Sequence, residues 1–188
     1  MAQTDIVPYT NRRIRRKGEA LPKSTDVAVL VEQMRKAMKI HDGIGIAAPQ
    51  IGEAVRVFII EKKLFPGADL PSDVFINPKI LRKGFKREIS EEGCLSVPNV
   101  FGQVSRSLKI TIEAFDQNWK RFRLSTQELL ARVLQHELDH LDGTLFIDKA
   151  DADTLHEVVY DKEGKPTLRP WTQKSKIQNP NDKTNSNF

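Results

Sequence analysis

The chain contains two stretches whose apolar residues recur at the spacing of an amphipathic helix. The apolar residues of the first stretch are Val27, Leu30, Val31, Met34 and Met38. This spacing predicts a helix with one buried stripe, because residues three and four positions apart share a helix face. We expect Ser24 or Thr25 to cap its start and the helix to end before Asp42-Gly43.

The second helical stretch has a broader apolar face. It is preceded by Ser125-Thr126-Gln127-Glu128, which has the form of a capping box. In that motif the Ser hydroxyl and the Glu carboxylate accept free backbone N–H groups at the start of a helix. The apolar residues that follow are Leu129, Leu130, Val133, Leu134, Leu138 and Leu141. We expect this helix to begin at the box and to stop at Asp142-Gly143.

Short runs rich in β-branched and aromatic residues predict strands between the two helices. These runs are Val55 to Ile60, Val74 to Ile76, Leu108 to Ala114 and residues 120–124. A turn at Asp116-Gln117-Asn118 is expected to join the last two. The order of helix, strands and helix predicts an α+β domain with a largely antiparallel sheet.

The pattern weakens beyond residue 150. Pro166 to Pro170 and the Asn-, Lys- and Pro-rich segment from Gln173 to Phe188 offer few side chains to bury. We therefore predict a folded domain over residues 1–150 and a divergent C-terminal extension over residues 151–188. The extension is expected to be partly flexible or held by a partner. A chain of 188 residues is long enough for one core, but too short for two ordinary domains.

The net charge of +5 is concentrated at the two ends of the chain. Residues 1–23 contain six Lys or Arg and two acidic residues, and residues 161–188 contain six and three. The N-terminal cluster consists of Arg12, Arg13, Arg15, Arg16 and Lys17. We expect it to be a solvated segment, although such cations can also contact phosphate or an RNA-rich surface without sequence preference.

The composition favours an intracellular protein. No apolar run approaches the length needed to span a bilayer, and the polar N-terminus lacks the apolar stretch of a secretory signal. Cys94 is the only cysteine, so no intramolecular disulfide can form, which fits a reducing compartment. We expect a cytoplasmic location, or an organelle if a transit peptide has been removed, and no membrane or sequence-specific nucleic-acid partner.

His136-Glu137-Leu138-Asp139-His140 is the first candidate for chemistry. On a helix, His136 and His140 project from one face and can reach a single cation, with Glu137 beside it. This HExxH spacing is typical of metal-dependent hydrolases, and two histidines with no ligand role are the alternative. A catalytic metal usually has three protein ligands and a water. Cys94 is a candidate for the third ligand, and His41 and His156 compete with it.

Three short motifs, present in order, resemble those of the peptide deformylases, which remove the N-terminal formyl group from nascent polypeptides. They are Gly43-Ile44-Gly45-Ile46-Ala47-Ala48-Pro49-Gln50, Glu92-Gly93-Cys94-Leu95-Ser96 and Gln135-His136-Glu137-Leu138-Asp139-His140. The resemblance covers residues 24–149. It implies mostly antiparallel sheets packed around a central helix that bears HExxH, with an N-terminal helix. Many members have a small residue, often Gly, where this chain has Glu128, and the capping box would explain why Glu is tolerated.

The resemblance also implies a role for each motif residue. Cys94, His136 and His140 would bind one divalent metal, natively Fe²⁺ in many members, and Zn²⁺, Ni²⁺ or Co²⁺ would suit the same donors. Glu137 would be the general base and then the acid toward the departing amine. The Gln50 side-chain amide and the Leu95 backbone N–H would stabilise the negatively charged oxygen of the tetrahedral intermediate.

The expected substrates are N-formyl-methionyl nascent polypeptides. Gly43 and Gly45 fit a loop that lies close to an extended peptide. Ile44 and Val133 would line a pocket for the methionine side chain, although Val133 suits the ordinary core almost equally well. We also expect Arg106 to pair with Asp139. The basic ends of the chain leave open a transient contact with the ribosome.

Two other functions are compatible with parts of this pattern. An HExxH metallopeptidase would share the water chemistry, but it would complete its metal site downstream of the helix, which points to His156 or Asp151. A binding-only relative would use the basic ends to grip a ribosome or RNA. The presence of Glu137, Gln50 and Cys94 argues against that second alternative, since a site without catalysis has no chemical need for all three.

Overall fold

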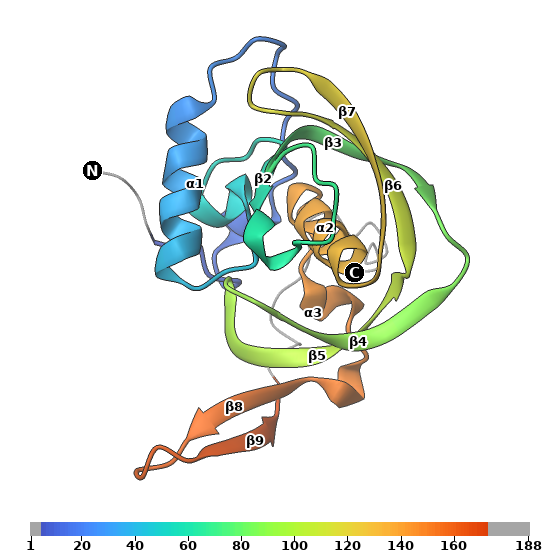
Figure 1. The fold of residues 1–188 in the computed structure, drawn as a ribbon. Helices are drawn as coiled ribbons and strands as arrows, with labels where there is room; N and C mark the ends of the chain where they lie inside the picture. Colours follow the sequence, from blue (N-terminus) through green and yellow to red (C-terminus); the bar gives the residue numbers. More distant parts are fainter. Residues whose placement is uncertain (1–4, 173–188) are drawn as a thin grey trace, which may run out of the picture.

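The computed structural model describes residues 5–172, and helix α2 (Glu128–Leu141) lies at the centre of the fold (Figure 1). Two antiparallel sheets surround this helix, and α1 (Ala28–Ile40) lies to one side. The α+β class, the antiparallel pairing and the N-terminal helix are therefore confirmed. No helix among residues 5–172 is long and apolar enough to cross a membrane.

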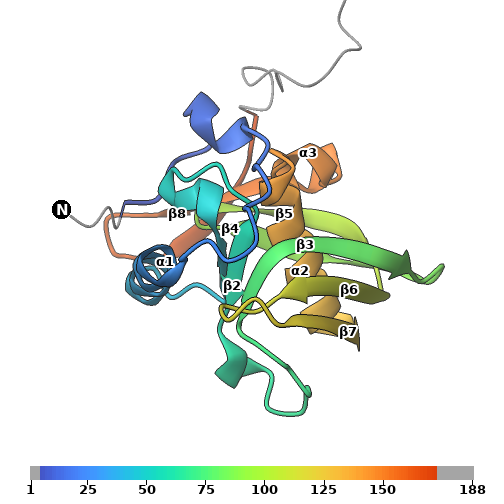
Figure 2. The same ribbon diagram turned by 90° about the horizontal axis from the view of Figure 1, so that it is seen from above.

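The larger sheet has the strand order β1-β2-β3-β6-β7. Its strands are β1 (Gly45–Ala47), β2 (Val57–Ile60), β3 (Val74–Lys83), β6 (Lys109–Phe115) and β7 (Arg121–Gln127). All four residues of β2 are buried because α1 covers one face of the strand and α2 covers the other. The continuous apolar run at this position thus reflects burial on both faces. Seen from above, β3, β6 and β7 lie side by side next to α2 (Figure 2).

The smaller sheet has the order β4-β5-β8-β9. A long hairpin of β4 (Arg87–Cys94) and β5 (Val97–Ser107) forms its first half, and β8 (His156–Tyr160) and β9 (Pro166–Pro170) form the second. The helix α3 (Phe146–Lys149) packs against β5 and returns the chain to this sheet. Four single-turn 3-10 helices complete the described elements: η1 (Arg12–Arg15), η2 (Ala48–Ile51), η3 (Lys62–Leu64) and η4 (Ala152–Thr154).

The segment after residue 150 is more ordered than the apolar pattern predicts. β8 pairs with β5, where Val100 lies opposite Glu157 and Phe101 lies opposite His156. β9 pairs with β8 along its whole length. All five residues of β9 are exposed, so backbone hydrogen bonds rather than buried side chains form this hairpin. The expectation of little structure at Pro166–Pro170 is wrong. The segment from Gln173 to Phe188 lies outside the described residues, and the division at residue 150 stays a prediction.

The predicted capping box is also wrong. Ser125, Thr126 and Gln127 belong to β7, where they pair with β6, and the Ser125 hydroxyl lies 2.9 Å from that of Thr111. Glu128 begins α2 with a φ of 59°, and its N–H donates to the carbonyl of Leu108. This left-handed conformation favours glycine. The backbone conformation at this position therefore explains why the family that the chain resembles often has a small residue here, which the capping box does not explain.

The start of α1 differs from the prediction in the same way. Neither Ser24 nor Thr25 caps the helix, since the Thr25 hydroxyl donates to the carbonyl of Pro22 and Ser24 has a φ of 71°. Instead, the Asp26 carboxylate accepts the backbone N–H of Ala28 at 2.9 Å. The helix ends at Ile40, before Asp42-Gly43, as expected.

Candidate active site

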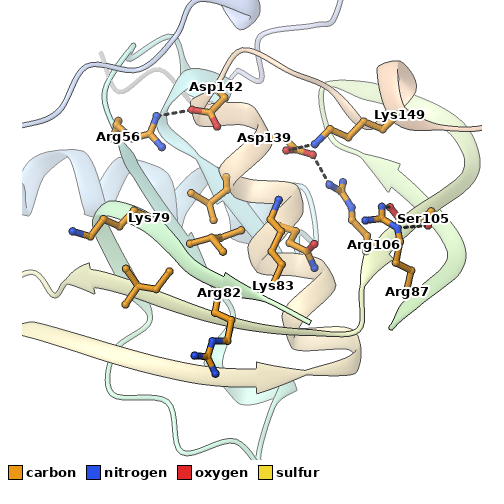
Figure 3. Close-up of a pocket in the computed structure, with 14 residues that line it drawn as sticks. Arg56, Lys79, Arg82, Lys83, Arg87, Ser105, Arg106, Asp139, Asp142 and Lys149 are labelled. Atoms are coloured by element: carbon orange, nitrogen blue, oxygen red, sulfur yellow. Dashed lines mark hydrogen bonds and ion pairs between the residues drawn. The ribbon is translucent and has the colours of Figure 1, made fainter. Parts of the chain in front are cut away.

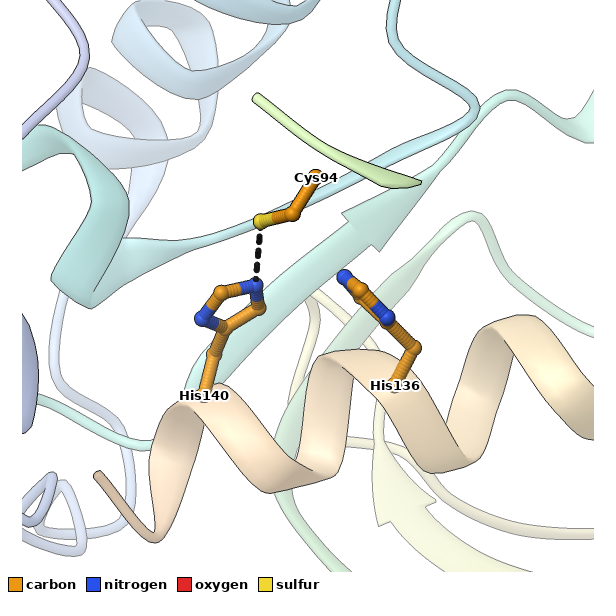
Figure 4. Close-up of side chains that lie close together, drawn as sticks. All are labelled: Cys94, His136 and His140. Carbon is orange, nitrogen blue, oxygen red and sulfur yellow. Dashed lines mark hydrogen bonds between the residues drawn. The ribbon is translucent and has the colours of Figure 1, made fainter. Parts of the chain in front are cut away.

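Three candidate metal ligands meet between α2 and the tip of the β4–β5 hairpin (Figure 4). His136 and His140 project from one face of α2, and Cys94 ends β4 above them. The Cys94 Sγ atom lies 3.2 Å from His140 Nε2, and the three candidate ligand atoms all lie within 4.8 Å of one another. Sequence motifs separated by 42 positions, from Cys94 to His136, therefore converge at one point.

The donor set fits a small divalent cation. A tetrahedral zinc-type site, with metal–sulfur and metal–nitrogen bonds of about 2.3 and 2.0 Å, places its donors roughly 3 to 4 Å apart. Burial lowers the pKa of His140 well below its usual value, which keeps this imidazole neutral and able to donate a lone pair. Among the described residues, Glu137 Oε2 and His140 Nδ1 are buried without a hydrogen-bond partner. The Glu137 oxygen is placed to bind a water or substrate group.

Glu92 holds His136 in position. The His136 Nδ1 atom lies 3.0 Å from Glu92 Oε2, so Nε2 is the nitrogen left for a metal. Arg106 donates two hydrogen bonds to the Glu92 carboxylate, at 2.9 and 2.8 Å, and Arg132 donates one at 2.8 Å. Burial alone would raise the pKa of Glu92, but the hydrogen bonds from Arg106 and His136 hold it well below its usual value. Glu92 is therefore ionised and accepts from three donors at once.

The predicted pair of Arg106 and Asp139 is confirmed. Arg106 Nη1 contacts Asp139 Oδ2, and Lys149 Nζ lies 2.5 Å from Asp139 Oδ1. Arg106 is 4% exposed and thus joins β5 to β4 through Glu92 and to α2 through Asp139. This buried cluster of charges fixes the hairpin on the helix.

Glu137 is buried beside the candidate ligands. The residue is only 4% exposed, and this burial raises the pKa of its carboxyl group to about 7. A carboxyl group with this pKa can both accept and release a proton near neutral pH. Gly45 lies against it, because a Cβ atom at that position would be 2.6 Å from Glu137 Oε1. The glycine thus makes room for the carboxylate, in addition to any contact with a peptide.

Gln50 is buried and oriented toward the same point. Its Oε1 accepts the backbone N–H of Ala47 at 2.8 Å, which turns the amide nitrogen the other way. Gln50 Nε2 lies 3.6 Å from Cys94 Sγ and 3.4 Å from Ser96 Oγ. The amide nitrogen therefore donates these two long hydrogen bonds beside the candidate metal site.

A cavity of about 540 Å³ opens onto these groups. Its walls include all of the predicted substrate-binding residues, together with Leu95: Gly43, Ile44, Gly45 and Val133. Ile44 is 42% exposed, whereas Val133 is 9% exposed and also packs in the core beneath α2, so both interpretations of Val133 describe part of its environment.

The two other histidines do not join the ligand group found among residues 5–172. His41 lines the cavity wall. His156 stacks on Phe101 and lies 3.0 Å from the carbonyl of Thr154 through Nδ1. Cys94 is therefore the candidate for the third ligand that the structure brings to the two motif histidines.

Known proteins resemble this chain in both sequence and fold. A family model described as polypeptide deformylase matches residues 3–155. A peptide deformylase of Karelsulcia muelleri is 42% identical over 144 residues, which cover 76% of this chain and 76% of the relative. The chain belongs to the polypeptide deformylase family. Among solved deformylases, the Synechococcus elongatus enzyme in complex with actinonin aligns with a TM-score of 0.71 and 36% identity, covering 78% of each chain. The Thermotoga maritima peptide deformylase aligns with a TM-score of 0.71 and 32% identity, covering 78% of this chain and 96% of that one.

Sequence reasoning missed two members of this deformylase-family site. Glu92 lies inside the second motif, but its role as the partner of His136 was not predicted. Arg132 is 6% exposed on the apolar side of α2 and bonds Glu92 as well as the carbonyls of Glu88 and Val104. An arginine within a broad apolar helix face is a signal that could have indicated a buried carboxylate partner.

Proposed function

We propose that this chain hydrolyses the formyl group of N-formyl-methionyl nascent peptides and releases formate. The meeting of Cys94 with the HExxH histidines, beside an ionisable Glu137 and the Gln50 amide, is the observation that carries this proposal. One divalent metal would be held by Cys94, His136 and His140. We take Fe²⁺ as the native ion, and Zn²⁺, Ni²⁺ or Co²⁺ suit the same thiolate and imidazole donors. We place the activity in the cytoplasm.

Each catalytic residue has a defined chemical role in this proposal. A metal held by these residues would lower the pKa of a water molecule toward neutral. Glu137 accepts a proton from the attacking water and delivers it to the departing amine, and this double role suits its raised pKa. The Gln50 amide and the Leu95 backbone N–H donate to the oxygen of the formyl group as it gains negative charge.

The cavity accounts for the substrate class. Gly43 and Gly45 let the backbone of an extended peptide approach the edge of β1, and Ile44 with Val133 contacts an unbranched apolar side chain. The formyl carbon would then lie between Glu137 and Gln50. A peptidase that cuts inside a chain would complete its metal site with a residue after the helix, whereas Cys94 here precedes the helix.

Formate release from a formyl-Met peptide under anaerobic conditions tests the proposal. Wild type reconstituted separately with Fe²⁺, Zn²⁺, Ni²⁺ or Co²⁺ is compared with Glu137→Ala and with Glu32→Ala, whose side chain is exposed on α1. We expect release by wild type and Glu32→Ala, and loss of release in Glu137→Ala with its metal content retained. Absence of release by every metal-loaded wild-type sample would refute the function, and full activity of Glu137→Ala would refute the assigned base.

A further inference from the structure

A second cleft, of about 810 Å³, lies on a different face of α2 from the candidate active site (Figure 3). The helix contributes Gln135, Leu138, Asp139 and Asp142 to this cleft, whereas His136, Glu137 and Val133 face the catalytic cavity. The opposite walls come from the end of β3 and from the β4–β5 hairpin. A ligand here would leave the entrance to the catalytic cavity open.

The cleft is strongly basic. Its lining contains seven cationic side chains, one of them the buried Arg106, and two acidic ones. The six others are Arg56, Lys79, Arg82, Lys83, Arg87 and Lys149. Both acidic groups are already paired, Asp142 with Arg56 at 2.7 Å and Asp139 with Arg106 and Lys149. Lys79 pairs with Glu113 at 2.9 Å, and Arg106 also pairs with Glu92, so in the described part of the chain the positive charge without a carboxylate partner is that of the three remaining cations.

The positive charge without a carboxylate partner is centred on the turn between β3 and β4. Within residues 5–172, no carboxylate forms an ion pair with Arg82, Lys83 or Arg87, and the Arg87 guanidinium bonds only to Ser105. All three side chains are exposed. The stretch from Leu81 to Arg87 thus presents unpaired cations in a short strand-and-turn segment.

An aromatic side chain stands among these cations. Phe85 lies at the tip of the turn and is 104% exposed, the largest value among the exposed apolar residues of the described chain. Its ring is fully in water, so its face is open to stacking by another planar group. Unpaired cations beside an exposed ring are the combination with which proteins bind single-stranded nucleic acids, since phosphates meet the charges and bases stack on the ring.

We propose that this cleft and turn bind the phosphate backbone of a single-stranded nucleic acid without reading its base sequence. A concave surface with cations on both walls suits a linear polyanion better than the flat surface of an anionic membrane. The N-terminal cluster lies outside this cleft, and its Arg15 is buried and pairs with Asp148. Together with the proposed function, on which this consequence rests, such binding would hold the protein near RNA where nascent chains emerge.

Fluorescence anisotropy with a short labelled RNA and a DNA of the same sequence tests the proposal. The cleft variant is Arg82→Gln/Lys83→Gln/Arg87→Gln. The matched control removes the same charge from exposed lysines outside the cleft, as Lys23→Gln/Lys36→Gln/Lys120→Gln. Binding is measured between about 50 and 200 mM KCl, because each phosphate contact lowers the slope of log K against log salt by roughly 0.7. Circular dichroism establishes that each variant is folded.

We expect wild type to bind RNA and DNA with similar affinity, with a dissociation constant on the order of 1 to 100 µM. The cleft variant should reduce the magnitude of the salt slope by about 2 and weaken binding at least tenfold, to roughly the same extent for every base sequence. Phe85→Ala should weaken binding by roughly 5- to 100-fold while leaving the salt slope unchanged.

Three results would overturn the proposal. They are wild-type affinity in the cleft variant, an equal loss in the control variant, and binding confined to phosphatidylserine vesicles. Because these measurements use binding alone, a nucleic-acid result stands or falls independently of formate release. An inactive protein that binds RNA through the cleft would refute the proposed function and keep this inference.

Discussion

Replacing Glu92 by Gln tests whether the buried carboxylate holds the β4–β5 hairpin on α2. The carboxylate can accept all four hydrogen bonds that reach it from Arg106, Arg132 and His136. A Gln amide has one acceptor oxygen, and it turns two N–H donors toward groups that themselves donate. About two bonds are lost, each of about 1.5 to 3 kcal/mol because charged groups are involved. We expect the free energy of unfolding to fall by about 3 to 5 kcal/mol, the range for breaking a buried ion pair.

Glu91→Gln provides a matched control on the neighbouring residue. The Glu91 side chain is 49% exposed and lies 3.5 Å from His156, so its loss should change stability by less than about 1 kcal/mol. Urea unfolding followed by circular dichroism, with a chelator present, measures the protein without metal. A Zn²⁺ titration of each variant then measures metal affinity, which we expect Glu92→Gln to reduce by about 10- to 100-fold through the loss of the His136 partner. Equal stability and equal metal affinity in the two variants would refute this account of Glu92.

Three further predictions concern the Gln50 amide, the residue that begins α2 and the ion-paired carboxylate of Glu113 on β6. Gln50→Ala should lower kcat for formate release by about 100- to 1,000-fold with the metal content unchanged, and a loss below tenfold would remove Gln50 from the site chemistry. Glu128→Gly should raise the free energy of unfolding by about 1 kcal/mol relative to Glu128→Ala, because glycine adopts the left-handed conformation without strain; a less stable glycine variant in urea unfolding would contradict this. The hydrogen bonds of Arg123 and Lys79 lower the pKa of Glu113 from 4.5 to about 2, so this folded-state pKa lies below the unfolded one. Wild type should therefore be more stable than Glu113→Gln above about pH 4.5, and the difference should shrink as pH falls toward 2 in unfolding experiments at each pH; a pH-independent difference would show that the pairing is unimportant.

The sequence predicted those parts of the fold in which burial on one face dominates. The apolar stripe of α1 packs in one hydrophobic cluster, and Ile110, Ile112 and Ala114 of β6 pack in another. Each pattern thus reflects burial of one face, and both elements formed as expected. The second and third motifs likewise pointed to side chains that the structure brings together, because Cys94, His136 and His140 are rare residue types at informative positions.

The sequence did not predict the elements whose formation depends on buried charges or on backbone pairing. β4 and β5 direct Glu92 and Arg106 inward, so charged residues occupy positions that an apolar pattern reserves for the core. β9 is held by backbone pairing and has no buried side chain. At Ser125, local capping chemistry competes with strand pairing, and the partner strand β6 decides the outcome. Such choices depend on residues that are distant in sequence.

The Glu92 cluster also bears on how the protein exchanges its metal. Ion pairs from Glu92 to Arg132, and from Arg106 to Asp139, tie the hairpin to the helix without using any metal ligand. The ligands are thus brought together by the protein itself, and a cation enters a site that is already assembled. A metal ion can then leave and be replaced while the sheet stays on the helix. The ion carried in a cell would accordingly be set by the local supply of metals and their oxidation, rather than by which ion was present when the chain folded.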